Sequence, residues 1–487
     1  MLTVQRHKTA IRRPDVSRPI RLALEHGLLS QATTFFDFGC GHGDDIFRLK
    51  QKGIDATGWD PIHRPETDRL PADVVNLGYV INVIEDPIER ASVLKLAWSL
   101  AQKLLIVSAR LSIEAKNGVS SSPFSDGYVT SRGTFQKYYD QRELCDWLDE
   151  VLGLQSVAVA PGVFYLFRDS DLRQSFGASR FRRTTAVPRQ KYSDLVFEQN
   201  RDLFDPLIAF ITNRGRLPGD SEVEQAPTIR EKLGSLQRAF AIVRQVTGSE
   251  QWERIREERS QDLLVYLALS RFAGRPKFSG LPNDLQFDIR AFFSTYRRAC
   301  ELADNLLFSA GNSEVISEAC RTSPVGKLLP DALYVHVSAM SSLPSVLRVY
   351  EGCARAYIGA VEGANVIKLK ISKPQISYLH YPDFEREAHP ALSGSLVVPL
   401  KTFRINYRDY SDSQNPFILH RKETLLVADH PLYARFERLT RQEERFGLYE
   451  HQESIGTKEG WERTLRSKGL VQSGHRLLRN TLSIPRR

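Results

Sequence analysis

The sequence predicts an α/β protein with a doubly wound domain at residues 1–185, an α-helical region at 192–325 and a mixed α+β region at 326–487. Strand-like apolar runs alternate with amphipathic helical segments over the first domain, which is typical of βαβ units. One of these runs breaks into a glycine-rich turn that opens a helix. After about residue 192 the apolar residues follow mainly a helical periodicity, and strand-like apolar runs return later in the chain. The length of 487 residues suits two or three domains.

Composition and charge limit the class of protein. Hydrophobic residues make up 41% of the chain and charged residues 26%, as in globular proteins. No apolar stretch approaches membrane-spanning length and the first residues lack the apolar core of a signal peptide, so we expect a cytoplasmic protein without a membrane partner. The five cysteines contain no C-x-x-C pair, so we expect neither a disulfide framework nor a metal site. The net charge of +9 favours a polyanionic partner.

The first expected elements are a helix at 20–26, which Gly27 would end, and a strand at 35–38 against which the helix packs. The strand runs directly into alternating glycines, after which a helix should begin. A second strand at 54–58 is followed closely by Asp60. Two parallel strands would therefore bring a glycine turn and a carboxylate to the same edge of a sheet.

The turn after the first strand predicts a nucleotide-type ligand site. It reads Asp-x-Gly-x-Gly-x-Gly, and glycine lets the backbone approach a ligand where a Cβ atom would collide. A dinucleotide fold would show G-x-G-x-x-G without an acid before the first glycine. The pattern instead resembles the S-adenosylmethionine (SAM) site of Rossmann-like class I methyltransferases, where the first acid faces the amino-acid end of the cofactor and the second its ribose. The expected cofactor-binding residues are Asp37, Gly39, Cys40, Gly41, Gly43 and Asp60.

The remaining elements of this domain continue the alternation. They are a buried strand at 72–80, a helix at 89–102, a strand at 104–108, a loop at 111–140, a helix at 143–152 and two strands within 156–167. The last two strands flank a Pro-Gly turn and should close the sheet as an antiparallel hairpin. Only twelve residues separate Asp60 from Asp73, so the strand that faces the adenine in this fold must be minimal or missing.

The second part of the chain reads as helices followed by mixed structure. Helices are expected at 203–211, 230–247, 250–272, 285–303, 315–320 and 344–357, and strands at 364–369, 375–379 and 395–400. The basic turn at 213–220 could belong to a small helical DNA-binding unit, although a plain connecting turn is the better interpretation.

Asn76 and Tyr79 are the candidate catalytic residues, because in this fold the acceptor approaches the carboxyl end of the strand that carries them. An amide oxygen there can accept a hydrogen bond from an exocyclic amine, and an aromatic ring can stack on an extruded base. DNA amino-methyltransferases use Asn-Pro-Pro-Tyr at this place, whereas this chain has Asn-Leu-Gly-Tyr. A structural role, with Asn76 capping the strand and Tyr79 packed under a helix, is an equally good interpretation.

Clustered cations suggest contact with nucleic acid. The loop at 121–140 interleaves aromatic residues with Arg132 and Lys137, a combination suited to stacking on bases and pairing with phosphates. Some of these aromatic residues would instead belong to the core. A second cluster, with Arg182 and Arg183 at its centre, lies at the expected domain boundary, and a third lies near the N-terminus. A solvated basic surface without a partner is the alternative.

Polar residues are also dense at 378–385 and 409–423. A Pro-Asp pair followed by Glu and Lys suggests a metal-dependent nuclease, but no strand-borne Glu-x-Lys follows at a suitable distance. We therefore interpret these segments as ion-paired loops.

Six segments resemble the bacterial DNA phosphorothioation-associated methyltransferase family, and the resemblance spans nearly the whole chain. The segments are 6–11, 36–41, 58–61, 75–86, 132–137 and 419–423, of which the Asn-Leu-Gly-Tyr-Val-Ile-Asn block is the most specific. The resemblance implies a SAM-binding protein that accompanies sulfur modification of the DNA backbone in bacterial antiviral defence, with DNA phosphorothioation proteins as possible partners.

The sequence therefore predicts a SAM-dependent methyltransferase whose partner is nucleic acid, most simply DNA. One alternative is a catalytically inactive SAM-binding sensor or adaptor that recognises modified DNA or a partner enzyme; the absence of both prolines after Asn76 favours it. Another alternative is methylation of RNA or of a small molecule.

Overall fold

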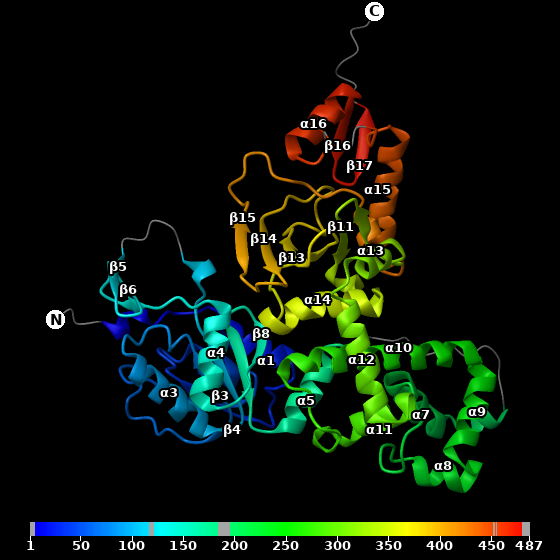
Figure 1. Ribbon diagram of the computed structural model, residues 1–487, viewed down its shortest axis with the longest axis horizontal. Helices are drawn as coiled ribbons and strands as arrows, with labels where there is room; N and C mark the ends of the chain where they lie inside the picture. The colour runs from blue at the N-terminus through cyan, green and yellow to red at the C-terminus, as the bar shows by residue number, and fades with distance from the viewer. Residues whose placement is uncertain (1–4, 116–120, 184–194, 451–452, 454, 480–487) are drawn as a thin grey trace, which may run out of the picture. The chain divides into compact units, whose positions relative to one another are not determined.

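The computed structural model describes residues 5–115, 121–183, 195–450, 453 and 455–479. Contacts divide the chain into two compact units. The first comprises 1–169, 325–339 and 353–487, and the second comprises 170–324 and 340–352. The two units are described separately (Figure 1).

A six-stranded sheet forms the N-terminal part of the first unit. Its strands are β1 Thr34–Phe38, β2 Asp55–Trp59, β3 Ala72–Gly78, β4 Ala101–Ser108, β8 Val157–Ala160 and β9 Val163–Phe167. They lie in the order β2-β1-β3-β4-β9-β8, with the first four parallel and the last two antiparallel. The expected Rossmann-like α/β fold with a closing hairpin is confirmed. From β1 the chain crosses to β2 on one side of β1 and then returns to β3 on its other side. The strand order therefore changes direction between β1 and β3.

Helices cover both faces of this sheet. They are α1 Arg18–Glu25, α2 Asp44–Gln51, α3 Pro87–Leu100 and α4 Gln141–Leu152. Helices α3 and α4 pack on the face that carries Phe36, Val75 and Leu105, where Leu94 and Leu144 are fully buried. Because strand side chains alternate, Asp37 and Asn76 point to the opposite face.

The segment between β2 and β3 contains no third strand. Within the described residues 60–71 the single pairing is a bridge between Asp60 and Arg64. The expectation that the adenine-facing strand is minimal or missing is confirmed, because so short a connection cannot hold a helix and a strand.

The predicted loop at 111–140 is wrong in part. It contains a three-stranded antiparallel sheet of β5 Ser121–Phe124, β6 Gly127–Thr130 and β7 Phe135–Gln136. A Cβ atom on Gly127 would lie 2.5 Å from Cζ of Phe135, so the hairpin depends on close packing that a strand pattern cannot reveal.

An antiparallel meander forms the C-terminal part of the first unit. Its strands, in chain order and also in sheet order, are β10 Lys327–Leu329, β11 Ala332–His336, β12 Val366–Lys370, β13 Gln375–His380, β14 Gly394–Pro399 and β15 Asn406–Asp409. Further elements are α15 Tyr433–Arg445, α16 Lys458–Ser467, β16 Leu470–Ser473 and β17 Arg476–Arg479. The mixed α+β region predicted here is confirmed.

The second unit is helical, as predicted. Its helices are α5 Ser170–Ser179, α6 Leu195–Gln199, α7 Arg201–Arg214, α8 Ala226–Leu233, α9 Leu236–Thr247, α10 Ser249–Leu269, α11 Asn283–Phe293, α12 Tyr296–Ser309 and α13 Ser313–Arg321, and α14 Ser345–Ile358 begins in it. The single helices predicted at 230–247 and 285–303 are each two helices. Gly234 (φ 87°) and Ser294 (φ 63°) break them in the left-handed region.

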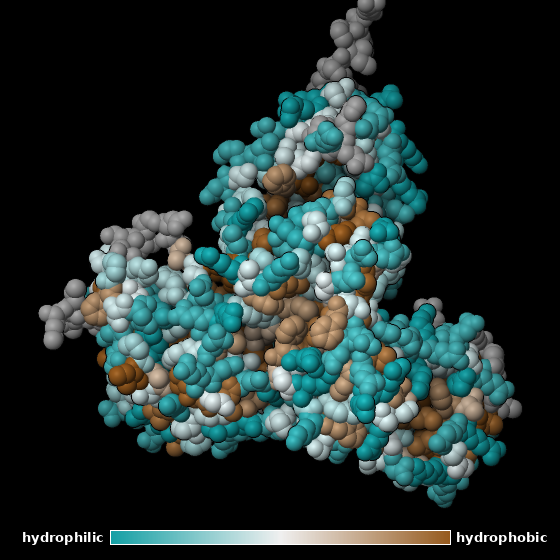
Figure 2. All heavy atoms as spheres, in the orientation of Figure 1, coloured by the Kyte–Doolittle hydropathy of each residue, from teal (hydrophilic) through white to brown (hydrophobic). Residues whose placement is uncertain are grey.

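Among the described residues, no helix combines the length and the apolar composition that crossing a membrane would require. Figure 2 shows mostly hydrophilic residues on the visible face, with smaller hydrophobic areas between them. Exposed apolar side chains include Ile88 and Phe308.

The close packing of β2 on β1 predicts the effect of a single methyl group. Gly58→Ala would place Cβ 2.7 Å from the Asp37 carbonyl oxygen and from Ile46 Cδ1. Overpacking of this kind should lower the free energy of unfolding by about 1–3 kcal/mol, measured by chemical denaturation. Gly456→Ala is the matched control, because nothing lies within 4 Å of its Cβ position. Equal stability of the two variants would contradict the packing described here.

Candidate functional site

Three glycines shape the turn between β1 and α2. Gly39, Gly41 and Gly43 all have left-handed φ angles of 84°, 53° and 81°. A side chain at Gly39 would lie 2.5 Å from Val80, and one at Gly43 would lie 2.6 Å from the Arg64 guanidinium. The turn therefore requires glycine both for its backbone conformation and for space.

Asp60, just after β2, holds this turn in place. Its Oδ2 accepts a hydrogen bond from the Gly41 backbone N–H at 3.0 Å. Its Oδ1 accepts from the backbone N–H groups of Ile62 and His63 at 3.0 and 2.9 Å. A carboxylate has about four acceptor positions, so one remains for a donor such as a ribose hydroxyl.

Asp37 and Asn76 form a buried pair where the sheet reverses. They are partners in the β1–β3 register, and Asn76 Nδ2 donates to Asp37 Oδ1 at 2.8 Å. Burial, together with the nearby carboxylate of Asp45, raises the pKa of Asp37 to about 7. Asn76 Oδ1 is buried and has no hydrogen-bond partner among the described residues. The pair thus combines a carboxyl group that ionises near neutral pH with an available acceptor.

A second buried carboxylate stands beside Asp37. Asp45, at the start of α2, accepts a hydrogen bond from the Ser17 backbone N–H at 2.7 Å, and burial raises its pKa. Asp37, Asp45 and Asp60 together give this part of the site an acidic character that suits a cationic ligand group.

The N-terminal segment completes the site, and the sequence analysis did not assign it there. The Ala10 side chain would lie 3.3 Å from a Cβ at Gly41. The Arg13 backbone N–H donates to Asp44 Oδ2 at 2.8 Å, and the Arg13 guanidinium lies 5.9 Å from the centroid of the Tyr79 ring. These partners are more than 30 positions apart, so no local sequence signal could have identified them.

Tyr79 has an unusual backbone conformation directly after β3. Its φ of 60° is left-handed, which costs energy for a residue other than glycine and often marks a functional position. Burial raises the pKa of Tyr79, and Arg18, Arg13 and Arg110 lie close enough to oppose that shift. Glu114 also lies near this ring and raises its pKa, and Arg18 is paired with Glu362, so the surroundings of Tyr79 carry both signs of charge.

Cys40 lies in the glycine turn but is not a nucleophile in this setting. Burial and the nearby Asp37 raise the pKa of its thiol to about 12, so the thiolate is scarce at neutral pH. Its contribution to the turn comes from its backbone, whose carbonyl accepts from the Gly43 N–H at 2.9 Å.

The two cations predicted to contact nucleic acid in the 121–140 segment lie in different surroundings. Arg132 is exposed in the turn between β6 and β7. Lys137 is buried, and its Nζ lies 3.0 Å from Asp126 and 2.7 Å from Glu143. Contact between Lys137 and a phosphate would require these ion pairs to open, whereas Arg132 can reach a ligand as it stands.

The other predicted nucleic-acid residues, Arg182 and Arg183, belong to the second unit. Arg183 Nε lies 2.7 Å from Asp262 Oδ1, so its guanidinium is engaged within that unit. Arg182 lines a small cavity. The basic cluster predicted around Arg182 and Arg183 also included Arg189 and Lys191, which lie outside the described residues. The N-terminal cluster is also partly neutralised: Arg6, Arg12, Arg18 and Arg21 each form an ion pair with a carboxylate.

The interpretation of the polar C-terminal segments as ion-paired loops is confirmed only in part, because no ion pair is found for the described residues 378–385. Arg421 pairs with Glu444 at 2.7 Å, and Lys422 donates from a buried position to the Phe384 and Glu387 carbonyls. Within the described part of the chain, no group of three or more His, Cys, Asp or Glu side chains could hold a metal ion.

Comparisons with known proteins identify similar structures but no family. No known family profile and no curated protein matches the chain. A sugar N-methyltransferase from Streptoalloteichus is 15% identical over 31% of this chain and 84% of its own, with a TM-score of 0.25. A SAM-dependent methyltransferase from Aquifex aeolicus is 16% identical over 31% of this chain and 89% of its own, with a TM-score of 0.22. One from Archaeoglobus fulgidus is 14% identical over 38% of this chain and 84% of its own, also with a TM-score of 0.22. At such low scores the fold assignment rests on the strand order alone.

The buried Asp37 predicts a pH-dependent stability. Because its pKa is raised in the folded state to about 7, the stability associated with the protonated form is complete below about pH 4 and is lost as pH rises through 7. Asp37→Asn keeps an acceptor for Asn76 and removes the charge. We expect the variant to gain up to about 4 kcal/mol over the wild type at pH 8 and little at pH 4.

Thermal unfolding of both proteins between pH 4 and 8 measures this difference. Asp55→Asn, which replaces an exposed carboxylate on β2, is the control substitution. A constant difference between Asp37→Asn and wild type across the range would show that Asp37 titrates normally.

Proposed function

We propose that the chain is a SAM-dependent methyltransferase and that its acceptor is DNA. One observation supports the proposal: the glycine turn with left-handed φ angles lies next to the Asp37–Asn76 pair, where the strand order changes direction between β1 and β3. Ligands of open α/β sheets bind at this point, beyond the carboxyl ends of the strands.

The residues of the turn fit the proposed cofactor. Asp37 would face its ammonium group, the backbone of Gly39–Gly43 would lie along it, and the remaining acceptor position of Asp60 would receive one ribose hydroxyl. When bound, the cofactor supplies an electrophilic methyl group on a sulfonium. The three carboxylates of the site complement the positive charges of such a ligand.

Asn76 and Tyr79 would position the acceptor. The unpaired Oδ1 of Asn76 can accept a hydrogen bond from an amine and orient its lone pair towards the methyl group. Its Nδ2 is held by Asp37, which fixes the direction of the oxygen. Tyr79 offers a half-buried ring for stacking on a base. These roles require only orientation, which is what an in-line methyl transfer needs.

Charge supports DNA as the acceptor. Arg13 and Arg110 lie near Tyr79, and the exposed Arg132 belongs to the same unit. A polyanionic acceptor would be attracted to guanidinium groups at this end of the site. The resemblance to the phosphorothioation-associated family extends the proposal to DNA that carries phosphorothioates, and to the proteins that introduce them.

A second candidate is a SAM-binding sensor that does not transfer methyl groups. Asn76 is only 2% exposed, and its amide nitrogen is committed to Asp37. The Asn-Pro-Pro-Tyr elbow of DNA amino-methyltransferases is Asn76-Leu77-Gly78-Tyr79 here. A sensor would keep the cofactor contacts and would lack turnover.

Cofactor binding can be tested with two aspartates of the β2 region. Asp60→Ala removes three backbone contacts and the proposed ribose contact, so SAM affinity should fall at least tenfold by calorimetry. Asp55→Ala, on the same strand and exposed, should bind SAM as wild type does. If neither substitution changes the affinity, the ligand does not bind at this turn.

Methyl transfer can be tested with labelled SAM and four acceptors: DNA from a phosphorothioating strain, DNA from a non-modifying strain, RNA and a small-molecule extract. We expect label in DNA. Asn76→Ala should lower turnover at least a hundredfold while SAM affinity stays within about threefold, because its acceptor contact strengthens in the transition state.

Circular dichroism of Asn76→Ala controls for misfolding. Asn82→Ala is a second control, because it also removes a buried amide, one that lies after β3. Wild-type protein that binds SAM and labels none of the four acceptors would favour the sensor. Label in RNA or in the extract alone would identify a different acceptor class.

A further inference from the structure

The second unit contains a small cavity that the proposed methyl transfer does not use. Its volume is about 30 Å³, which exceeds the space that one water molecule needs and is far below that of a nucleotide pocket. Its lining includes three arginines, Arg182, Arg214 and Arg259, and two aspartates, Asp262 and Asp288.

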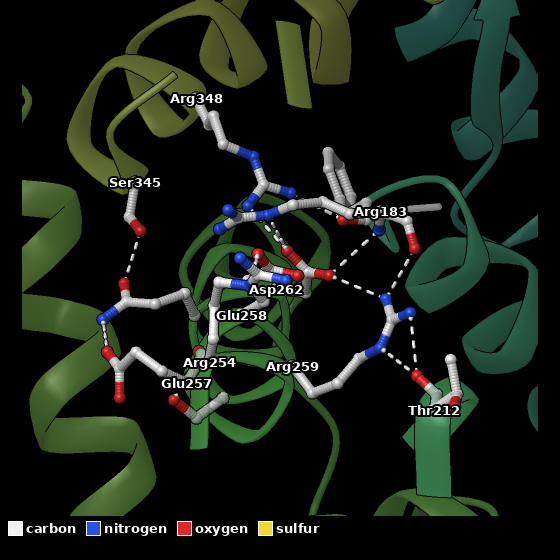
Figure 3. A network of polar contacts seen from close by, with 12 residues as sticks. Arg183, Thr212, Arg254, Glu257, Glu258, Arg259, Asp262, Ser345 and Arg348 are labelled. Carbon is white, nitrogen blue, oxygen red and sulfur yellow. Dashed lines mark hydrogen bonds and ion pairs between the residues drawn. The ribbon is translucent and has the colours of Figure 1, made fainter. Parts of the chain in front are cut away.

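Asp262 is the centre of a network in which it is fully occupied (Figure 3). Its Oδ1 accepts from Arg183 Nε and Arg348 Nη1, both at 2.7 Å. Its Oδ2 accepts from the Arg183 backbone N–H at 2.9 Å and from Arg259 Nη1 at 3.2 Å. Four donors exhaust the acceptor positions of one carboxylate, so Asp262 cannot also neutralise Arg182.

The other two arginines of the lining are satisfied. Arg214 pairs with Asp288 at 2.9 Å and also with Asp284. Arg259 donates to the Thr212 carbonyl at 3.2 Å and to the Arg183 carbonyl at 2.6 Å, in addition to Asp262. Asp288 accepts from Arg216 as well, at 2.6 Å.

Arg182 differs from these arginines. No described residue provides a hydrogen-bond acceptor or an ion pair for its guanidinium. Burial lowers the pKa of Arg182, and the neighbouring Arg214 and Arg259 lower it further, while Asp288 and Asp284 oppose that shift. Arg182 is half-buried, so its five donors remain available to water or to a bound ligand.

We propose that this cavity binds a small oxyanion of the phosphate type, with Arg182 as its principal ligand. The planar guanidinium fork matches two oxygens of such an anion. Arg214 and Arg259 are already paired with carboxylates, so Arg182 provides the proposed contact. The small volume selects an isolated anion or a terminal phosphate over a larger ligand. The site lies within the second unit and does not depend on the methyltransferase proposal.

Calorimetric titration of the full chain with sodium phosphate, in chloride buffer of matched ionic strength, tests the proposal. We expect saturable binding, and at least tenfold weaker binding by Arg182→Gln. Arg182→Lys keeps the charge without the fork and should fall between the two. The matched control is Arg238→Gln, which removes an exposed arginine of α9 and should bind phosphate within twofold of wild type.

Two further arms separate the ligand from its alternatives. The first arm tests whether a dinucleotide competes with phosphate, with and without a 5′-phosphate. Competition by the phosphorylated form alone would identify a terminal phosphate as the ligand, and competition by neither form would identify the free anion. In phosphate-free buffer the circular dichroism spectrum of Arg182→Gln should match that of wild type, which separates a loss of phosphate binding from misfolding. Unchanged phosphate affinity in a folded Arg182→Gln, or no saturable binding by wild type, would each overturn the proposal.

Discussion

The hydrogen bond between Asp37 and Asn76 is the constraint on which the candidate site depends. It joins the two strands between which the sheet reverses, and it buries a carboxyl group that water would otherwise stabilise. The amide of Asn76 offsets part of that cost, and burial still raises the pKa of Asp37 to about 7. A cationic ligand group at this position would replace the proton and relieve the cost of burial.

The charges of the site are separated along this pair. Carboxylates of Asp37, Asp45 and Asp60 gather around the glycine turn, whereas the guanidinium groups of Arg13 and Arg110 lie near Tyr79 together with the carboxylate of Glu114. The N-terminal segment links the two sides, because the Arg13 backbone binds Asp44 while its side chain lies near the Tyr79 ring. Such a separation suits a reaction in which a positively charged donor meets a negatively charged acceptor, and it would guide each to its own side.

Local sequence patterns predicted most of the helices and strands. They failed where contacts between distant residues determine the structure. The alternation of apolar runs predicted the sheet, its closing hairpin and the missing strand after Asp60, since each follows from composition and length. The small sheet at 121–136 was predicted as a loop because its strands are short and its stability comes from the Phe135 ring against Gly127. The break at Ser294 was also missed, because serine rarely adopts a left-handed φ.

The sequence by itself determined the acid and glycine turn, because consecutive residues set its backbone conformation and the sheet then brings Asp60 to it. Only the tertiary structure decided which charges remain available. The sequence does not distinguish Lys137 from Arg132, or Arg183 from Arg182. In the structure Lys137 pairs with Asp126 and Glu143, and Arg183 pairs with Asp262. Their partners lie up to 79 positions away, and Coulomb attraction depends on distance in space, which a linear pattern does not record.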